Sequence, residues 1–153
     1  MNYTQYALKK LKGDHFKITR PREMIVRLLD KSERALTPYE MRDYLNGKKI
    51  KADVVTIYRV LETLEKLSLA HKVLAFGGYI ACNMNNQKKG DAIKRCHHYL
   101  ICNRCHRVDE VRGEDLSKLE KRIAGEHQFN IQSHYIEFIG LCKKCREFVS
   151  RKR

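Results

Sequence analysis

Residues 53–82, DVVTIYRVLETLEKLSLAHKVLAFGGYIAC, hold a helical pattern followed by a strand pattern. Asp53 can cap the helix, in which apolar residues recur at helical spacing and should face a core: Val54, Ile57, Leu61 and Leu64. Another face of the helix should be exposed and contains Thr56, Arg59, Thr63 and Lys66. The Gly-Gly pair at 77–78 is typical of a two-residue turn and predicts a β-hairpin with strands at 70–76 and 79–82.

Further helices precede this segment. Two of them begin with a threonine cap followed by a proline and a glutamate that can reach back to the cap: Thr19, Pro21 and Glu23, then Thr37, Pro38 and Glu40. A shorter helix is expected at 3–12, and the helix after Thr37 should end at Asn46-Gly47. Helices followed by a hairpin in this order are typical of a winged helix-turn-helix, which we assign to residues 1–82 as a DNA-binding domain.

The rest of the chain has a different organisation. Residues 83–95 are polar and contain Gly90, so we expect a hinge or linker there. Beyond it the patterns predict two short strands, a helix and a longer strand, at 96–101, 107–112, 115–126 and 129–139. The fold class is therefore α+β, a winged helix-turn-helix followed by a small α/β dimerisation and metal-binding domain at 96–153. This second domain has too small a core to be stable alone, so we expect a partner chain and a metal to stabilise it.

Two Cys-x-x-Cys motifs, Cys102 with Cys105 and Cys142 with Cys145, are separated by 36 residues. Each motif brings two thiolates together from one tight loop, and two motifs complete a tetrahedral zinc site with no open position. Such a closed site is structural, and its binding energy contributes to folding. A dithiol switch or an iron–sulfur cluster is the alternative, but paired motifs in a basic chain favour zinc.

The charge of the chain favours a polyanionic partner. Its 32 Lys and Arg residues against 18 Asp and Glu residues give a formal net charge of +14, which attracts nucleic acid. No apolar segment is long enough to span a membrane, and no basic amphipathic segment indicates a membrane surface. No secretion signal is evident, so we expect a cytoplasmic protein whose six cysteines suit metal binding better than disulfides.

Four motifs carry a resemblance to a known family: ITRPR at 18–22, TIYR at 56–59, HHYLICNRC at 97–105 and GLC at 140–142. With these motifs the chain resembles the ferric uptake regulator family over nearly its whole length. The resemblance implies a bacterial transcription regulator with an N-terminal winged helix, a C-terminal dimerisation domain, a structural zinc site and a regulatory metal site at the hinge. Members of this family sense iron, zinc, manganese, nickel or peroxide, so membership alone does not identify the signal.

The hairpin offers the first two candidate ligands of a regulatory metal. If residues 77–78 form a two-residue turn, Val73 faces Cys82 across the hairpin. His71 is then the diagonal neighbour of Cys82 on the same face, and both side chains can reach one ion. Cys82 stands at the start of the linker, so a metal bound there would stiffen the hinge.

Two residues of the second domain complete this set. His97 opens the first strand of that domain, and Glu110 lies on the strand after the first Cys motif. With His71 and Cys82 they form a set of one sulfur, two nitrogens and one oxygen, which zinc accepts tetrahedrally. Taken singly, each of the four is more often a surface or packed residue than a ligand, and His98 is an alternative to His97.

Departures from the iron sensors of the family favour zinc as the signal. Iron sensors usually have a carboxylate where Cys82 stands, a histidine where Ala35 stands and another histidine where Tyr99 stands. A thiolate at the hinge, with His71 eleven residues before it, resembles the zinc uptake regulators.

A further group of potential ligands is weaker. Cys96, His98 and His134 could bind another metal ion. The acidic partner that is usual in the family is not evident near Ser117. We therefore interpret these three as ordinary packed or surface residues.

The DNA contacts follow from the helix-turn-helix. Its second helix enters the major groove with its N-terminal residues nearest the base edges, which places Thr56 and Arg59 over bases. Tyr58 should lie beside a phosphate or a thymine methyl group, and the Arg59 fork suits a guanine edge. Further candidate contacts are Lys17, Arg20 and Arg22, toward phosphates or the minor groove, and Tyr39.

Together these features predict a zinc-responsive repressor of metal-uptake genes, a homodimer with two zinc ions per chain that binds a palindromic double-stranded DNA operator. The same architecture sensing iron is the first alternative. A zinc-dependent nucleic-acid hydrolase is less favoured, because the sequence has no H-E-x-x-H motif, no paired acidic motif and no P-loop. A zinc-ribbon interaction module would leave the winged helix unexplained. We expect no enzymatic activity, no small-molecule substrate and no membrane partner.

Overall fold

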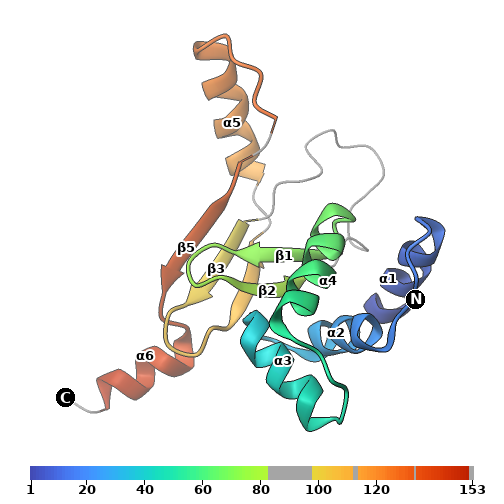
Figure 1. Cartoon of the computed structure of the whole chain (residues 1–153). Coiled ribbons are helices and arrows are strands. Elements are labelled where there is room, and N and C mark those ends of the chain that lie inside the picture. Colours follow the sequence, from blue (N-terminus) through green and yellow to red (C-terminus); the bar gives the residue numbers. More distant parts are fainter. Residues whose placement is uncertain (83–97, 112–113, 133, 152–153) are drawn as a thin grey trace. The chain divides into compact units, whose positions relative to one another are not determined.

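Figure 1 shows the protein as a computed structural model, which describes residues 1–82, 98–111, 114–132 and 134–151. The chain divides into two compact units, Met1–Asn86 and Gln87–Arg153, and each is described by itself. Within the described residues, no helix is long and apolar enough to cross a lipid bilayer.

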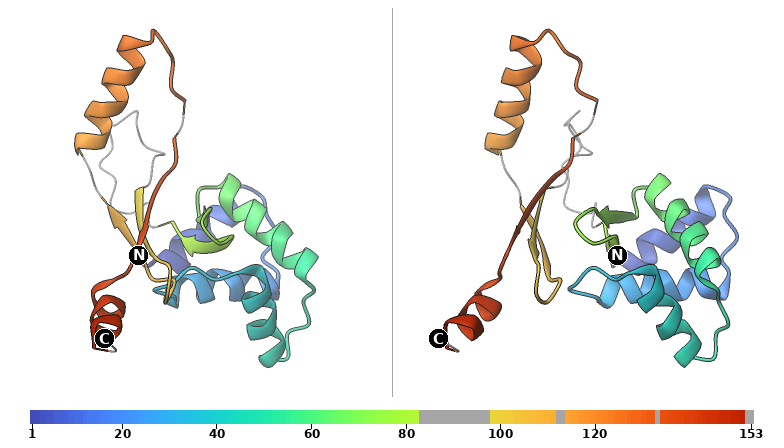
Figure 2. Two further views of the ribbon diagram at one scale, coloured as in Figure 1. Left: turned by 90° about the vertical axis from the view of Figure 1, so that its left-hand side faces the viewer. Right: turned by 60° about the vertical axis from the view of Figure 1, so that its left-hand side comes forward.

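The first unit is a winged helix-turn-helix, as the sequence predicts. Four helices follow one another along the chain: α1 (Tyr3–Gly13), α2 (Arg20–Lys31), α3 (Pro38–Gly47) and α4 (Val54–Lys66). An antiparallel hairpin of β1 (Ala70–Val73) and β2 (Gly78–Ala81) comes next, with β1 against α4 and β2 against α2 (Figures 1 and 2). Leu36, between α2 and α3, joins the hairpin through two backbone hydrogen bonds with Tyr79, of 3.0 and 2.8 Å.

Side-chain caps begin these helices at the three predicted positions and at one more. The side chains of Asn2, Thr19, Thr37 and Asp53 each accept a hydrogen bond from the backbone N–H three residues later. Glu40 completes the predicted capping box with Thr37. The capping box predicted for Thr19 and Glu23 is wrong, because Glu23 lies one residue too far along the helix. Its carboxylate instead pairs with Arg27 at 2.8 Å.

Four helix ends share one backbone conformation. The residues His15, Lys49, Ser68 and Gln128 are in the left-handed region, with φ values of 63°, 58°, 54° and 49°. The following N–H bonds back to a carbonyl five residues earlier: Phe16 to Leu11, Ile50 to Leu45, Leu69 to Leu64 and Phe129 to Ala124. This Schellman motif satisfies carbonyls of the last helical turn, although none of the four positions is a glycine. A side chain in this region costs about 1 kcal/mol in backbone strain.

The hairpin has a longer loop than predicted. Its strand pairing ends with Val73 opposite Gly78, so residues 74–77 form a four-residue loop in which Gly77 adopts a φ of 69°. The predicted two-residue turn is therefore wrong. Gly78 belongs to the strand, where a Cβ atom would lie 2.7 Å from the Phe76 ring. The register moves by four residues, an even number, so each side chain keeps its predicted face.

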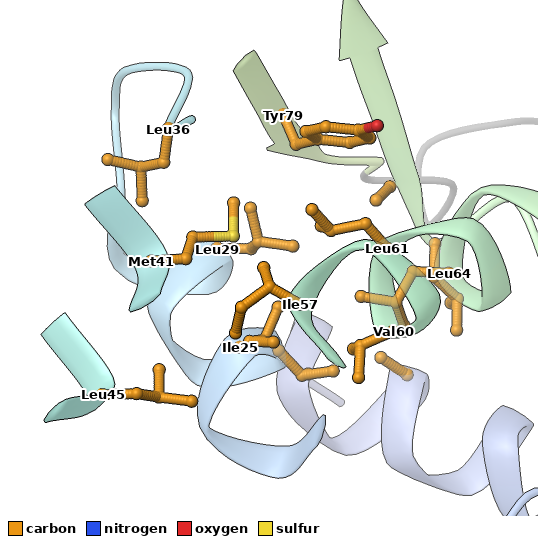
Figure 3. Close-up of a cluster of buried hydrophobic side chains, with 14 of the residues drawn as sticks. Ile25, Leu29, Leu36, Met41, Leu45, Ile57, Val60, Leu61, Leu64 and Tyr79 are labelled. Carbon is orange, nitrogen blue, oxygen red and sulfur yellow. The ribbon is translucent and has the colours of Figure 1, made fainter. Parts of the chain in front are cut away.

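The core of the first unit lies among the four helices and the hairpin (Figure 3). Its fully buried side chains include Leu11, Ile25, Leu29, Met41, Leu45 and Leu69. The predicted core positions of α4 are confirmed at Ile57, Leu61 and Leu64, whereas Val54 is half-buried. Burying one such side chain contributes roughly 1.5–3 kcal/mol, so apolar packing is the main source of stability in this unit.

The second unit is built on a three-stranded sheet with the order β4-β3-β5. Strand β3 (His98–Cys102) is antiparallel to β4 (Val108–Val111) and parallel to β5 (Ile136–Gly140). Helix α5 (Glu114–Glu126) comes between β4 and β5, and α6 (Lys143–Ser150) follows β5. The two helices lie at opposite ends of the sheet (Figure 2).

Two elements of this unit differ from the sequence prediction. The strand predicted at 129–139 begins only at Ile136, partly because residues 128–129 complete the end of α5. Helix α6 is not predicted, because its eight residues give too short a helical pattern. Cys142 occupies its N-cap position, so the second Cys motif lies at a helix start.

The second unit buries few large apolar side chains. Among those that the structure describes in this unit, only Tyr99 and Ile101 are almost fully buried. Many others are exposed on the sheet and its two helices: Leu100, Leu119, Ile123, Phe129, Tyr135, Phe138, Ile139, Leu141, Phe148 and Val149. This part of the chain therefore gains little stability from a core of its own.

Candidate metal centres and nucleic-acid interface

The parallel pairing of β3 with β5 brings the two Cys-x-x-Cys motifs together. Cys102 is the last residue of β3 and its partner in β5 is Gly140, so both motifs begin at the same edge of the sheet. The Sγ atoms of Cys102, Cys105, Cys142 and Cys145 lie within 4.8 Å of one another. We call this cluster the four-cysteine clamp. Four converging sulfur atoms are the donor set of a closed structural zinc site.

Backbone and side-chain contacts hold the two motifs against each other. The Cys102 N–H donates to the Arg107 carbonyl at 2.9 Å, which closes the turn of the first motif. The Cys142 N–H donates to the Cys102 sulfur at 3.4 Å. The guanidinium of Arg104 lies 4.1 Å from the centre of the Phe148 ring, which adds a cation–π contact between the first motif and α6.

The thiols of the clamp differ in acidity. Although burial opposes its ionisation, backbone N–H groups of Cys142, Cys105 and Arg104 lower the pKa of Cys102 to about 6. Burial and hydrogen bonds with the neighbouring thiols raise the pKa of Cys145 to about 12. The cluster therefore ionises unevenly, because negative charges at this spacing repel one another. A divalent cation would offset that repulsion and allow four thiolates, so these residues fit zinc.

Two of the predicted hinge ligands lie at the base of the hairpin. His71 pairs with Ile80, and Cys82 follows β2 with its N–H donating to the Leu69 carbonyl at 3.0 Å. His71 is therefore diagonal to Cys82 on one face, as predicted, although the register differs. The Cys82 side chain is only 4% exposed, whereas His71 is half-buried.

Tyr3 of α1 lies beside Cys82. Its hydroxyl donates to the Leu69 carbonyl at 2.5 Å, the same acceptor that the Cys82 N–H uses. Burial, the Cys82 thiol and the Asp30 carboxylate, in that order, raise the pKa of Tyr3. The phenol and the thiol are thus close enough to interact electrostatically.

The other two predicted hinge ligands belong to the second unit. Glu110 is an exposed residue of β4 that pairs with Tyr99 of β3. His97 lies outside the described residues. The complete ligand set of His71, Cys82, His97 and Glu110 therefore stays a prediction.

A second ligand cluster lies at the opposite edge of the sheet from the clamp. His98 starts β3 and pairs with Ile136, so His134 just before β5 lies next to it. The Nε2 atoms of His98 and His134 are 2.7 Å apart. The other ring nitrogen of His134, Nδ1, is 3.4 Å from a buried carboxylate oxygen of Glu120 in α5. Two converging imidazole nitrogens suit a divalent metal, and a carboxylate commonly orients such a histidine.

Interpreting His98 and His134 from the sequence as ordinary packed or surface residues misses this contact. Their approach depends on the parallel pairing of β3 with β5, which local patterns do not indicate. Glu120 stands three residues after Ser117, nearly one helical turn along α5. The helical period could therefore have indicated Glu120 as the acidic partner in place of Ser117. Cys96, the third residue of the group, lies outside the described residues.

Helix α4 presents the predicted base-reading residues near its N-terminus. The Asp53 carboxylate accepts a hydrogen bond from the Thr56 N–H at 2.7 Å. Hydrogen bonds from Thr56 hold the pKa of Asp53 below its usual value. Tyr58 and Arg59 are exposed, whereas the preceding residue Ile57 is buried. Because Ile57 packs in the core, it determines which face of α4 points to solvent. Of the face that the sequence predicts to be exposed, Arg59 and Lys66 are exposed, whereas Thr56 and Thr63 are half-buried.

The remaining candidate DNA contacts lie at the starts of α2 and α3. Lys17 and Arg20 are exposed, and Tyr39 in the first turn of α3 is 55% exposed. Arg22 is half-buried: its guanidinium donates to the Lys17 carbonyl and lies 5.7 Å from the centre of the Phe16 ring. Arg22 thus also organises the loop that carries Lys17. Their roles as DNA contacts stay predictions.

Comparison with known proteins gives consistent results. The ferric uptake regulator family matches residues 14–139. The chain is 32% identical over 138 residues to the ferric uptake regulation protein of Bacillus subtilis (strain 168), which covers 90% of each chain. It is 28% identical over 131 residues to the zinc uptake regulation protein of Escherichia coli (strain K12), covering 86% of this chain and 74% of that one. The solved structure of a zinc uptake regulator complexed with zinc and DNA is also similar, with a TM-score of 0.79 and 26% identity over 96% of this chain and 95% of that chain.

We expect Cys102→Ser to release the clamp zinc and to destabilise the second unit, because a closed thiolate site supplies folding free energy. Zinc per chain, thermal unfolding and sedimentation are measured after treatment with a mild chelator. The matched control is Cys82→Ser, a cysteine outside the clamp, which should keep the clamp zinc and the dimer. A Cys102→Ser protein that loses zinc but unfolds at the wild-type temperature would contradict the structural role.

Proposed function

The chain belongs to the ferric uptake regulator family, and we propose that it is a zinc-responsive repressor that binds operator DNA as a homodimer. The observation that carries this proposal is the position of Cys82, a buried thiol diagonal to His71 at the base of the hairpin. These two side chains lie where the winged helix ends and the chain continues toward the second unit. A signal bound there can act on the DNA-binding unit directly. Genes for metal uptake are the corresponding targets.

The DNA-binding part of the proposal rests on the first unit and on charge. The winged helix exposes Tyr58 and Arg59 on α4, and the net charge of +14 supplies attraction for phosphates. The similar solved regulator is bound to DNA, and its likeness covers nearly the whole of both chains. A dimer presents two such helices, so a palindromic operator is the natural target.

Zinc is supported by the chemistry of the hinge residues. Cys82 offers a thiolate, His71 and His97 offer imidazole nitrogens, and Glu110 offers a carboxylate. Thiolates prefer borderline-soft ions such as zinc, whereas ferrous iron favours nitrogen and oxygen ligands in an octahedral shell. The sequence identity is 32% to the ferric uptake regulation protein of Bacillus subtilis and 28% to the zinc uptake regulation protein of Escherichia coli, so the two values are similar. Overall similarity does not separate the two signals, so the iron-sensing alternative is tested through Cys82.

The hinge residues explain how binding becomes repression. When bound, zinc would cross-link side chains of both units, since Cys82 and His71 belong to the first and Glu110 to the second. Cys82 fixes the end of β2, and β1 and β2 contact α4 and α2. The populated orientations of the winged helices are then restricted to those that fit two half-sites, which raises operator affinity.

The dimer is supported by the apolar surface of the second unit. Leu100 and Phe138 are partners on neighbouring strands and are about half exposed, at 49% and 46%. Ile139, which alternates to the other face of β5, and Leu141, which follows the strand, are exposed as well. An apolar sheet face of this kind, in a unit with little core of its own, is suited to burial against a second copy.

We propose two zinc ions per chain, one in the clamp and one at the hinge. The His98–His134 pair with Glu120 is a further candidate metal site, which would take up a third ion when zinc is titrated in excess. The protein acts in the cytoplasm, on double-stranded DNA, and is a regulator rather than an enzyme. No small-molecule substrate and no membrane partner belong to this function.

We expect Cys82→Ser to abolish the zinc response, because the hinge loses its proposed thiolate ligand. Operator binding is followed while buffered free zinc or ferrous iron is titrated into protein whose clamp still holds zinc. Wild-type protein should respond to zinc at far lower free concentration than to iron, and the variant should keep its dimer and clamp zinc. An unchanged zinc threshold in Cys82→Ser would show that the hinge site is misassigned. Activation by iron alone at physiological concentration would favour the iron alternative.

We expect Arg59→Ala to reduce discrimination between operator and random DNA by about 1–3 kcal/mol, because a base-reading fork is lost. Lys17→Ala is the comparison variant. It should weaken binding to both DNAs alike and lower the slope of log affinity against log salt by about one. Affinities are measured at several salt concentrations. Equal losses on both DNAs for Arg59→Ala would make Arg59 a phosphate contact.

We expect His134→Ala to bind one metal ion fewer than the wild-type protein when both are titrated with zinc, because the converging nitrogen pair is broken. The exposed His127, at the end of α5, provides the control His127→Ala, which should bind as many ions as the wild type. Equal metal content in the wild type and His134→Ala would leave the His98–His134 contact a packing interaction.

A further inference from the structure

The proposed DNA-reading helix α4 ends in a motif that extends to the hinge. Ser68 adopts the left-handed conformation, and its N–H donates to the Glu65 carbonyl at 2.8 Å. The N–H of Leu69 donates to the Leu64 carbonyl at 2.7 Å. Leu69 is fully buried, so its peptide group is fixed to the last turn of α4.

The carbonyl of Leu69 is the point where three segments meet. It accepts one hydrogen bond from the Tyr3 hydroxyl of α1 at 2.5 Å and another from the Cys82 N–H at 3.0 Å. The exposed fractions of Tyr3 and Cys82 are 5% and 4%. Water therefore has little access to either bond, and a hydrogen bond in such surroundings is stronger than one in solvent.

Tyr3 is itself held in place. Its neighbour Thr4 donates through its hydroxyl to the Asp30 carboxylate of α2 at 2.5 Å. Asn2 caps α1 in a reciprocal pair with Gln5. The Tyr3 ring belongs to the hydrophobic core of the first unit. The hydroxyl therefore comes from a rigid support and does not adjust freely if the Leu69 carbonyl moves.

We propose that Tyr3 is a positioning residue for the hinge metal: through the Leu69 carbonyl its hydroxyl fixes the backbone of Cys82 and couples that ligand to the end of α4. This inference rests on the proposed role of Cys82 as a hinge ligand. The geometry makes a short path from metal to DNA-reading helix, with Cys82, Leu69 and α4 joined by backbone hydrogen bonds. Tyr3 keeps that path rigid, so the thiol of Cys82 is preorganised for metal binding.

The test removes only the hydroxyl. Tyr3→Phe keeps the ring in the core, and Tyr6→Phe, one turn later on α1 and partly buried, is the matched control. Operator binding is followed against buffered free zinc, with the clamp filled. We expect Tyr3→Phe to need about three- to tenfold more free zinc, the size of effect that one net hydrogen bond represents. Operator affinity at saturating zinc should be unchanged, which also shows that the variant is folded.

Two further measurements separate positioning from a general loss of stability. In protein without hinge metal, hydrogen exchange at the Cys82 amide should be faster in Tyr3→Phe than in Tyr6→Phe. In a Cys82→Ser background, which lacks the zinc response, Tyr3→Phe should leave operator binding unchanged at every zinc concentration, although any effect on thermal unfolding would remain.

The outcomes of these experiments are distinct. If Cys82→Ser alone leaves the zinc response intact, the hinge assignment fails and this inference fails with it. If Cys82→Ser abolishes the response but Tyr3→Phe has the same zinc threshold as Tyr6→Phe, the hinge assignment stands and the role of Tyr3 is refuted. A change in operator binding caused by Tyr3→Phe that persists in the Cys82→Ser background would also refute it, because the hydroxyl would then act without the thiol.

Discussion

The register in which β3 pairs with β5 is the constraint on which the second unit depends. Parallel strands place both of their starts at one edge of a sheet and both of their ends at the other. The pairing of Cys102 with Gly140 therefore assembles the four-cysteine clamp, and the pairing of His98 with Ile136 brings His134 beside His98. A slip of one residue would disturb both clusters and exchange the two faces of the sheet. Since this unit buries few large apolar side chains, ligand geometry defines it more than core packing does.

The first unit follows the opposite principle. Its helices and hairpin surround a continuous apolar core, and the residues with chemical roles lie at the margin of that core. Cys82 and Tyr3 are buried there against the Leu69 carbonyl, while Arg59 and Tyr58 project from the solvent face of α4. In the proposed mechanism, a change at the hinge would reach α4 through the hydrogen bonds at the Leu69 carbonyl, next to the C-terminal end of the helix.

The features that sequence predicts here are those fixed by local spacing. The caps at Thr37 and Asp53, the apolar period of α4 and the two Cys motifs depend only on near neighbours in the chain. The hairpin register is not fixed in this way, because Gly78 lies in a strand, where Phe76 and Ala35 leave no room for a Cβ atom, and not in the turn that a Gly-Gly pair suggests. The approach of His98 to His134, which are 36 positions apart, likewise needs the β3–β5 pairing. The diagonal relation of His71 to Cys82 is predictable despite the wrong loop, because an even shift preserves the face.

The left-handed helix ends have an evolutionary consequence. His15, Lys49, Ser68 and Gln128 each hold a side chain in a conformation that glycine adopts without strain, at a cost of about 1 kcal/mol. At His15, Lys49 and Gln128, which are exposed, a single substitution by glycine relieves that strain without altering a proposed metal or DNA ligand. When substitutions that change DNA or metal specificity lower the free energy of unfolding, a glycine at one of these sites can restore part of it. Ser68 differs, because a glycine there would add backbone freedom next to the Leu69 carbonyl, which the proposed path from the hinge to α4 uses.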